Sequence, residues 1–525
     1  MKLLLAQEMR HMDGLTMKAG LPGTVLMDRA ANGALRAFLD YFRPSPSASI
    51  GLFCGTGNNG GDGVAMALGL YNRGFSPRLL RLGPLKSCAA DAQVFWKTAE
   101  TLLPEELFLE ASCLRELQEV LPQLADLDFY IDALLGTGLD RPVEGRYAEA
   151  IAFLKSRKAP LFALDIPSGL HADSGQILGD APKVQATASF GFRKIGHCLD
   201  PARSLCGTLF DIDIQIPKQI QEKVGFSATG LDEEWLRSKI MARPRDFHKG
   251  RAGRILLIGG RAPTTGAIAL SAEGALVGGG GLISVLTSTE ALHHFSPEVM
   301  AAPVFDQKGT LGDKSREIEV LEVSLKKALE KAERVVLGPG LGIDDLSSQT
   351  LEIVLKSSPE VLILDADGLT LLAEDQSLRD LARAFARERA LIVTPHPGEC
   401  SRLLNSSTET ILKAPIEAAQ ELADNLGATA VVKTAATIIA TGKSSLAINL
   451  TGNPGMATGG MGDALTGLIA SLWTEFPNQP HLVACAAVAL HGLAGDRGAQ
   501  KKGHRGLTVR ALLDEVGPLW QALEP

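Results

Sequence analysis

The sequence lacks a basic stripe, a cysteine framework and a long apolar segment. Its 525 residues carry a formal net charge of −8, so nothing favours binding to a nucleic-acid backbone. The seven cysteines form no Cys-x-x-Cys pair and are odd in number, which is typical of a reducing compartment. No segment reaches the roughly 20 apolar residues of a membrane-spanning helix, and the apolar start Met1–Ala6 is too short for a secretory signal. We therefore expect a cytoplasmic protein without nucleic-acid or membrane partners.

What is present is an ordinary globular composition, with 45% hydrophobic and 21% charged residues. Short apolar runs recur along the chain with helix-like stretches between them, and glycines often follow the runs. This alternation predicts an α/β protein with parallel sheets covered by helices on both faces. The runs are 50–54, 129–131, 161–164, 255–258, 335–337, 361–364 and 391–393.

The length fits two domains. Lys218–Gly230 is polar and shows no clear strand or helix pattern, so we place the boundary near residues 220–235. The two halves share the α/β rhythm but no repeated motif, which indicates two different domains rather than a duplication. We expect them to span residues 1–220 and 231–525.

A glycine-rich loop, Gly55–Gly63, follows the first predicted strand and precedes a helix-like stretch from Val64 to Tyr71. Backbone N–H groups of such a loop can face an anion at the start of a helix. Its Gly-x-Gly-x-x-Gly pattern alone is equally typical of a simple glycine turn. The next predicted strand, Arg78–Leu82, lacks the acidic residue that holds the ribose in NAD-dependent dehydrogenases. The pattern therefore disfavours a dehydrogenase but allows binding of a pyrophosphate.

Three charged residues, Asp132, Asp165 and Lys194, stand at or after other predicted strands of the first half. A single aspartate at a strand end usually has a turn or capping role. Because the ends of parallel strands meet at one edge of a sheet, three such residues together favour a functional site.

With these motifs and the opening Leu26–Ala30, residues 1–217 resemble the NAD(P)H-hydrate epimerase family. The combination of Asn58–Gly63 with Asp165–Gly169 carries the likeness. It implies a Rossmann-like three-layer α/β/α domain and a potassium ion held by Asn59, Asp132 and Ser168. Oxygen ligands suit such a hard cation. The residues implied to contact the hydrated cofactor are Asn58, Asn59, Gly60, Gly61, Asp62, Gly136, Thr137, Gly138, Leu139, Asp140, Arg141, Pro142 and Asp165.

The family's reaction interconverts the R and S forms at the hydrated carbon of the nicotinamide ring. Such a reaction needs a group that lends and recovers a proton near the ring. We expect Asp165 to handle the proton and Lys194 to assist with charge.

The second half contains a glycine cluster directly before a helix-like stretch, Ala464–Trp473. Asn453–Asp463 holds four glycines, whose N–H groups at a helix start would form an anion hole. Asp463 would accept a proton from an attacking hydroxyl, as phosphoryl transfer requires. The helix dipole and backbone donors are expected to favour its ionised form. The alternative is that Asp463 only caps the helix, which the glycines ahead of it disfavour.

The Gly460–Asp463 arrangement looks like the ribokinase-like fold. Together with His248–Gly250, Gly338–Gly342 and Thr394–Glu399, it makes residues 231–525 similar to the NAD(P)H-hydrate dehydratase family. The resemblance implies that Ala267, Gly342, His396 and Asp463 contact the hydrated cofactor. It implies a nucleotide site formed by Lys433, Thr434, Ala435, Ala436, Thr437, Gly459, Gly460 and Gly462.

Two local features bear on these assignments. A lone histidine is more often a structural hydrogen-bonding group, but prolines on both sides of His396 make its loop rigid and favour a substrate contact. Thr434 stands where the family usually has glycine, so the resemblance gives less support for a close approach of the nucleotide to the backbone there.

Taken together, the resemblances imply a bifunctional enzyme that repairs hydrated NADH and NADPH. One half would epimerise the R and S forms; the other would phosphorylate the S epimer and release phosphate, with ADP favoured over ATP as co-substrate and AMP as product. Magnesium would bridge the nucleotide phosphates, and a homo-oligomer is expected. The alternatives are a kinase of a small alcohol or vitamin with an N-terminal nucleotide-binding module, and a non-catalytic nucleotide sensor. Asp165 and Asp463 stand in loops suited to catalysis, and a protein that keeps both is not expected to be a non-catalytic sensor.

Overall fold

The computed structural model describes residues 1–305, 314–442 and 445–524, and the chain forms two compact units. The N-terminal unit is Lys2–Ala228, and the C-terminal unit is Thr229–Pro525 together with Met1. All seven apolar runs predicted as strands are strands, which confirms the α/β class. Within the described ranges, no helix is long and apolar enough to cross a membrane.

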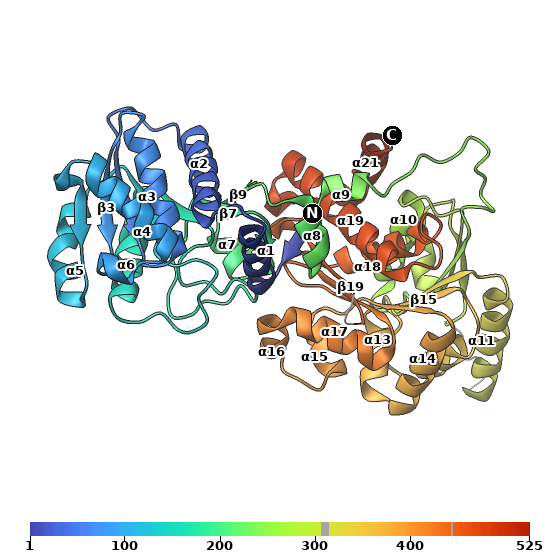
Figure 1. Ribbon diagram of the computed structural model, residues 1–525. Helices are drawn as coiled ribbons and strands as arrows, with labels where there is room; N and C mark the ends of the chain where they lie inside the picture. The colour runs from blue at the N-terminus through green and yellow to red at the C-terminus, as the bar shows by residue number, and fades with distance from the viewer. Residues whose placement is uncertain (306–313, 443–444, 525) are drawn as a thin grey trace. The chain divides into compact units, whose positions relative to one another are not determined.

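The N-terminal unit is built on a seven-stranded parallel sheet (Figure 1). Its strand order is β4-β3-β2-β5-β6-β7-β9, and every neighbouring pair is parallel. The sheet strands are β2 (Ser49–Cys54), β3 (Ser76–Arg81), β4 (Phe108–Glu110), β5 (Phe129–Ala133), β6 (Leu161–Leu164), β7 (Ala186–Phe190) and β9 (Thr208–Ile212). Two short strands, β1 (Lys2–Leu4) and β8 (Arg193–Lys194), pair with each other outside this sheet.

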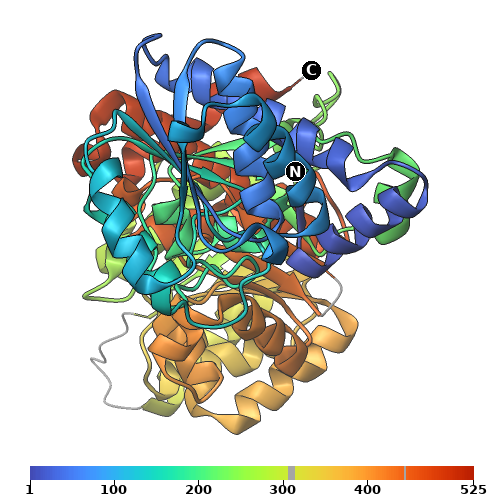
Figure 2. The same ribbon diagram turned by 60° about the vertical axis from the view of Figure 1, so that its left-hand side comes forward.

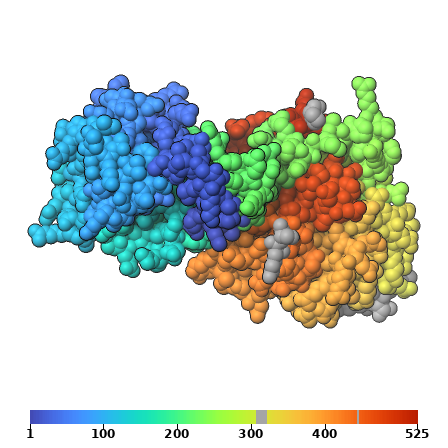
Figure 3. Space-filling model, in the orientation of Figure 1, coloured from blue at the N-terminus to red at the C-terminus, as the bar shows by residue number. Residues whose placement is uncertain are grey.

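Helices cover both faces of this sheet, as Figures 1 and 2 show. One apolar core joins the sheet to α2 (Gly23–Phe42), α3 (Asn58–Tyr71) and α4 (Ala90–Leu102). A second core lies on the opposite face, against α5 (Leu114–Val120) and α6 (Gly145–Ser156). The helix α1 (Ala6–Lys18) packs beside α8 (Lys218–Val224) and forms part of the outer surface (Figure 3). This is the three-layer arrangement predicted for the first half.

The chain order reverses at β2, because β3 and β4 follow on one side of it and β5, β6 and β7 on the other. In open α/β sheets, ligands bind outside the carboxyl ends of the strands at such a switch point. The Gly55–Gly63 segment follows β2, and Asp132 ends β5, so both lie at this crevice.

The glycine segment is partly helical, in contrast to the predicted loop. Helix α3 begins at Asn58, six residues before the expected start at Val64. Its glycines allow a close approach: a Cβ on Gly60 would lie 1.9 Å from the carbonyl oxygen of Gly55, and one on Gly63 would lie 2.6 Å from the Cβ of Ala133. The helix therefore starts directly against the strand ends, which a larger side chain would prevent.

The C-terminal unit contains a larger, mixed sheet. Its order is β13-β12-β11-β14-β15-β16-β17-β18-β19-β10, parallel throughout except for the antiparallel pairs β17-β18 and β18-β19. The strands are β10 (Ala228–Leu231), β11 (Arg254–Ile258), β12 (Leu282–Thr287), β13 (Met300–Pro303), β14 (Arg334–Leu337), β15 (Val361–Leu364), β16 (Ala390–Val393), β17 (Thr429–Val432), β18 (Ile438–Thr441) and β19 (Ser445–Asn449).

Helices α10 (Thr265–Val277), α18 (Met461–Leu472) and α19 (Pro480–Lys502) share one large apolar core with α20 (Val509–Leu513) and α21 (Val516–Leu523). The other helices of this unit are α9 (Glu233–Arg237), α11 (Lys314–Leu329), α12 (Asp345–Leu355), α13 (Asp367–Glu374), α14 (Gln376–Glu388), α15 (Pro397–Leu403), α16 (Thr408–Lys413) and α17 (Pro415–Leu426). Helices α10 and α18 touch at glycines: a Cβ on Gly467 would lie 1.9 Å from the carbonyl oxygen of Ser271. This close packing fixes the start of α18, where Asp463 lies.

The prediction that Lys218–Gly230 has no regular structure is wrong. It forms α8 and most of β10, which pairs with β19. Helix α8 is only seven residues long, so its periodicity is hard to detect in the sequence. Ile220 and Val224, four residues apart, pack against the apolar core of the N-terminal unit and hold the helix in place.

Two candidate active sites

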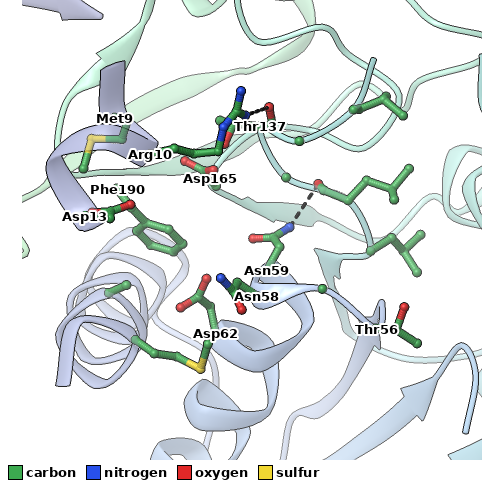
Figure 4. Close-up of a pocket in the computed structure, with 18 of the residues that line it drawn as sticks. Met9, Arg10, Asp13, Thr56, Asn58, Asn59, Asp62, Thr137, Asp165 and Phe190 are labelled. Atoms are coloured by element: carbon green, nitrogen blue, oxygen red, sulfur yellow. Dashed lines mark hydrogen bonds between the residues drawn. The ribbon is translucent and has the colours of Figure 1, made fainter. Parts of the chain in front are cut away.

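A pocket of about 1160 Å³ opens at the strand ends of the N-terminal unit. It is lined by α1, the start of α3, the segment after β5 and the ends of β6, β7 and β8 (Figure 4). Of the predicted contacts, the whole Gly136–Pro142 segment lines the pocket, together with Asn58, Asn59, Asp62 and Asp165. Gly60 and Gly61 instead pack into the interior, against Gly55 and Met27. The geometry therefore gathers most of the predicted residues around one cavity.

Asp165 and Lys194 form the charged centre of this pocket. The Nζ of Lys194 lies 2.6 Å from Oδ1 of Asp165, and only 1% of the lysine side chain is exposed. Burial works against the charged carboxylate, but the charge and hydrogen bond of Lys194 outweigh it and lower the pKa of Asp165. Asp165 is thus held ionised, which suits a proton acceptor.

The backbone of Asp165 is constrained as well. Its φ of 61° lies in the left-handed region, which is uncommon for residues other than glycine. Its N–H donates to the carbonyl of Ala188 at 2.7 Å, and Nε2 of His197 donates to its carbonyl at 2.8 Å. Such strain persists where the surroundings over-determine it, and it clusters at functional sites.

Two of the predicted potassium ligands, Asn59 and Ser168, lie at the carbonyl of Leu135, and Ser168 links them to Asp132. Asn59 Nδ2 donates to this carbonyl at 3.0 Å; Ser168 Oγ lies 3.3 Å from it and donates its proton to Oδ1 of Asp132 at 2.6 Å. Asp132 is fully buried, and burial raises its pKa. The Oδ1 atom of Asn59 is buried without a hydrogen-bond partner. An orphaned amide oxygen beside a buried carboxylate and a hydroxyl fits a hard monovalent cation.

Two of the further carboxyl groups that line this pocket, Asp62 and Asp13, have raised pKa values, and Asp13 was missed in the sequence. Burial raises the pKa of Asp62 well above its usual range, and burial raises the pKa of Asp13 to about 6. Asp13 comes from α1, where Met9, Asp13 and Met17 recur every four residues on one helix face. An acidic residue on an otherwise apolar helix stripe is the signal that could have revealed it.

In the C-terminal unit, the predicted anion hole stands at the first turn of α18. Gly460, the N-cap residue, has a φ of 91°, which requires glycine. A Cβ on Gly462 would lie 2.9 Å from Nζ of Lys433, so the lysine reaches the start of the helix. The glycine cluster and Lys433, which were predicted from separate segments to bind the nucleotide, therefore lie next to each other.

Asp365 holds this lysine and was not predicted. Its Oδ1 lies 2.7 Å from Nζ of Lys433, and 2% of the Asp365 side chain is exposed. Burial disfavours the charged ammonium, but the charges of Asp365 and Glu399 outweigh it and raise the pKa of Lys433. Asp365 directly follows β15, and Ala366 after it has a φ of 47°. Its position at a strand end was the available signal.

The expected electrostatics of Asp463 are wrong in direction. Burial first, and then the charge of Asp365, raise the pKa of Asp463 to about 6 despite its place in the first turn of α18. A carboxyl with this pKa is mostly ionised at neutral pH and accepts a proton more readily than an ordinary aspartate. Ser271 on α10 fixes its backbone by donating to its carbonyl at 2.8 Å.

The His396 loop lies beside the same cluster. The N–H of Lys433 donates to the carbonyl of Pro395 at 2.8 Å, which ties the end of β17 to this loop. His396 is the N-cap of α15: its Nδ1 accepts the N–H groups of Gly398 and Glu399. Burial raises the pKa of Glu399 to about 7. The histidine thus has a structural role, while its ring remains half exposed and able to contact a ligand.

The remaining predicted contacts lie on neighbouring turns. Gly342 donates its N–H to Asp367 at 2.8 Å, and the charge of Asp367 is among the causes that raise the pKa of Asp463. Ala267 is in the first turn of α10, one turn before Ser271. Thr434 closes the turn between β17 and β18, since its hydroxyl donates to the carbonyl of Ala436 at 2.7 Å. The threonine that departs from the family pattern is therefore accommodated inside the turn.

Comparison with known proteins finds relatives for both units. Residues 23–196 match the family described as YjeF-related protein N-terminus, and residues 255–517 match NAD(P)H-hydrate dehydratase. The bifunctional NAD(P)H-hydrate repair enzyme Nnr of Moorella thermoacetica is 33% identical over 543 residues, covering 100% of this chain and 97% of the relative. The protein of the same name from Escherichia coli K12 is 34% identical over 512 residues, covering 95% and 89%.

Solved structures give a partial likeness. A ribokinase-like superfamily protein from Enterococcus faecalis is 29% identical and covers 57% of this chain and 97% of its own, with a TM-score of 0.48. The ADP/ATP-dependent NAD(P)H-hydrate dehydratase from Bacillus subtilis, co-crystallized with ATP and Mg²⁺, is 26% identical and covers 57% and 100%, with a TM-score of 0.47.

Two α/β units, each with a charged site at the carboxyl ends of its strands, define a two-site enzyme. Since both family models match and the relatives align along most of their length, the chain belongs to the family of bifunctional NAD(P)H-hydrate repair enzymes. The family resemblance predicted from the sequence is confirmed.

Proposed function

We propose that this protein repairs hydrated NADH and NADPH. Residues 1–220 act as the epimerase that interconverts the R and S forms, and residues 231–525 act as the dehydratase that returns the S form to the reduced coenzyme. The observation that carries the proposal is the position of Asp463, a carboxyl with a pKa of about 6 at the glycine-rich start of α18, beside the Lys433–Asp365 pair.

In the proposed dehydration, Asp463 takes the proton of the ring hydroxyl as that oxygen attacks the terminal phosphorus of the nucleotide. The N–H groups at the start of α18, together with the ammonium of Lys433, hold the charge of the transferring group. Phosphate then leaves far more easily than hydroxide. The co-substrate is ADP in preference to ATP, AMP is released, and magnesium enters with the nucleotide as its metal complex.

In the proposed epimerisation, Asp165 exchanges a proton with the substrate and Lys194 keeps that carboxylate ionised. Asn59, Asp132 and Ser168 would hold a potassium ion, which supplies positive charge for the substrate's polar groups when bound. The orphaned Oδ1 of Asn59 supports this placement. An epimerase joined to a dehydratase that accepts one epimer lets the whole mixture pass through a single dehydration site.

A cytoplasmic location and a homo-oligomeric state are part of the proposal. The location is supported by the seven cysteines, all within the described residues and all free thiols. The implied substrates are small molecules, hydrated NADH and hydrated NADPH.

Incubation with separated R and S hydrates, and with ADP or ATP in turn, tests the proposal. We expect absorbance of reduced nicotinamide to return from both epimers, with one free phosphate released per coenzyme. A stable phosphate ester without recovery of absorbance would instead identify a small-alcohol kinase. Nucleotide binding with no turnover of either epimer would identify a sensor.

A further inference from the structure

A carboxyl group outside the predicted site shares the pocket of Asp165. Asp13, in the middle of α1, lines the same cavity as Asp62, Asp165 and Lys194. Figure 4 shows Asp13, Asp62 and Asp165 directed toward one space between α1, α3 and the segment that carries Thr137. None of the motifs that identify the epimerase half includes Asp13.

The surroundings of Asp13 favour its neutral form. Its Oδ1 is buried and has no hydrogen-bond partner, so an ionised carboxylate there would lack compensation. Burial raises its pKa to about 6; Lys194 lowers it and Asp165 raises it further. Asp165, in contrast, is held ionised by Lys194 at 2.6 Å. The pKa values of these two carboxyl groups are shifted in opposite directions, so Asp13 keeps its proton to a higher pH than Asp165, as the acid and the base of one reaction require.

We propose that Asp13 is the general acid of the epimerase site, where it protonates the hydroxyl group that leaves the hydrated nicotinamide ring. Asp165 is then the base that receives a proton from the water that adds back. The inference rests on the proposed function and deepens it, because it adds a second catalytic residue to that reaction.

The step balances without any further reactant. The ring nitrogen donates its lone pair to the neighbouring carbon, the bond from that carbon to the hydroxyl breaks, and the proton of Asp13 converts the leaving hydroxyl to water. Water adds to the other face of the iminium carbon, the C=N electron pair returns to nitrogen, and Asp165 takes the proton of the added water. Proton exchange with solvent restores both carboxyl groups.

Asp62 suits this role less well than Asp13. It is 8% exposed, and burial holds its pKa well above the usual range, so it releases a proton reluctantly near neutral pH. General acids work best when their pKa lies near the operating pH. Asp62 is then a neutral neighbour. The charged and titratable groups that line this pocket besides Asp13 are Arg10, Asp62, Asp91, Asp140, Arg141, Glu144, Tyr147, Asp165 and Lys194.

The test is the full-length variant Asp13→Asn, which keeps the size and the neutral state of the side chain. Conversion of pure R hydrate, followed without nucleotide by chromatographic separation of the two epimers, reports epimerisation; recovery of reduced coenzyme from pure S hydrate and ADP reports the C-terminal unit alone. We expect kcat for the R hydrate, corrected for spontaneous epimerisation, to fall by at least about 100-fold, with KM little changed. Turnover of the S hydrate stays at the wild-type rate.

The pH profile separates an acid from a structural residue. Wild-type kcat for the R hydrate should fall as pH rises through about 6, because Asp13 loses its proton there, and Asp13→Asn should lack this fall. Asp40→Asn, an exposed carboxyl on α2, is the matched control and should retain both the rate and the profile. An Asp13→Asn epimerisation rate within about threefold of the wild-type rate would overturn the role of Asp13 as the acid. A wild-type pH profile of epimerisation that is flat from pH 5 to about 8 would also overturn it, even if the variant failed to fold. Failure of the wild type to speed conversion of the R hydrate would instead reject the proposed function.

Discussion

The ammonium of Lys433 lies 2.7 Å from the carboxylate of Asp365 at the start of α18, with only 2% of the Asp365 side chain exposed. This pair does two things at once. Asp365 holds the lysine against Gly462, where a transferring phosphoryl group would bind, and its negative charge is the second cause, after burial, of the raised pKa of Asp463. One carboxylate therefore positions the ammonium of Lys433 and raises the pKa of Asp463, the proposed base.

Replacing Asp365 with Asn should shift the pH dependence of dehydration. With Asp463 as the proposed base, kcat/KM is expected to fall as pH drops through about 6. Without the charge of Asp365 the pKa of Asp463 falls, because the charge of Lys433 remains, and the acidic limb moves to lower pH. Rates measured between pH 4.5 and 8 with the S hydrate and ADP check the direction.

The same substitution should also cost stability. Removing one partner of a buried ion pair costs roughly 3–5 kcal/mol, and we expect a value at the lower end, since 20% of the Lys433 side chain is exposed. Urea unfolding measures the loss. Glu374→Gln, an exposed carboxyl on α13, is the control and should change neither stability nor the profile. An unshifted acidic limb in Asp365→Asn would disprove the tuning.

Asp463→Asn should abolish dehydration while leaving nucleotide binding intact. The amide cannot take the hydroxyl proton, but the N–H groups of α18 and Lys433 are unchanged. We expect kcat to fall by roughly 100- to 10,000-fold, with the dissociation constant of ADP, measured by calorimetry, within about threefold of wild type. Turnover retained at the wild-type level would show that Asp463 only caps the helix.

Asp165→Asn should stop conversion of the R hydrate and destabilise the N-terminal unit. Lys194, 1% exposed, would be left as a buried unpaired cation, which costs roughly 3–5 kcal/mol. Because the folded pKa of Asp165 is lowered, its contribution to stability is present above its ordinary pKa and is lost as pH falls through the lowered value. Unfolding free energies at pH 7 and pH 3 should therefore differ less in the variant. Unchanged epimerisation rates would remove Asp165 from the mechanism.

Much of the fold followed from apolar periodicity, because buried parallel strands are short continuous apolar runs. The run 161–164 coincides with β6, whereas the helix starts were placed too late, at Val64 and Ala464. Glycine has a low helix propensity, so a glycine-rich first turn looks like a loop in the sequence. The structure shows that Gly60, in the first turn of α3, packs too closely against the carbonyl of Gly55 to carry a side chain.

The sequence predicted a candidate site residue where that residue is part of a motif. It did not predict residues that reach the site only through the fold. Asp165 and Asp463 stand in recognisable strings, but Asp13 reaches the pocket from α1, far from the other carboxyl groups in sequence. Asp365 is one of several aspartates after strands, and only the ion pair with Lys433, 68 residues away, distinguishes it. The raised pKa of Asp463 could not be predicted either, because burial depends on α10 and on the strands around it.

Asn59→Ala tests the potassium site without relying on catalysis. The variant removes the buried, unpartnered Oδ1 that would complete the cation's shell with Asp132 and Ser168. A ligand present at 100 times its dissociation constant stabilises a folded protein by about 2.7 kcal/mol, so potassium chloride should raise the midpoint of thermal unfolding of wild type above that in choline chloride of equal ionic strength. Asn59→Ala should lose this difference, while Asn32→Ala, an exposed amide on α2, should keep it. The epimerisation rate of the wild type should show the same salt preference. Equal melting midpoints of the wild-type protein in the two salts would mean that the oxygen cluster stabilises the strand ends through its own hydrogen bonds and binds no potassium.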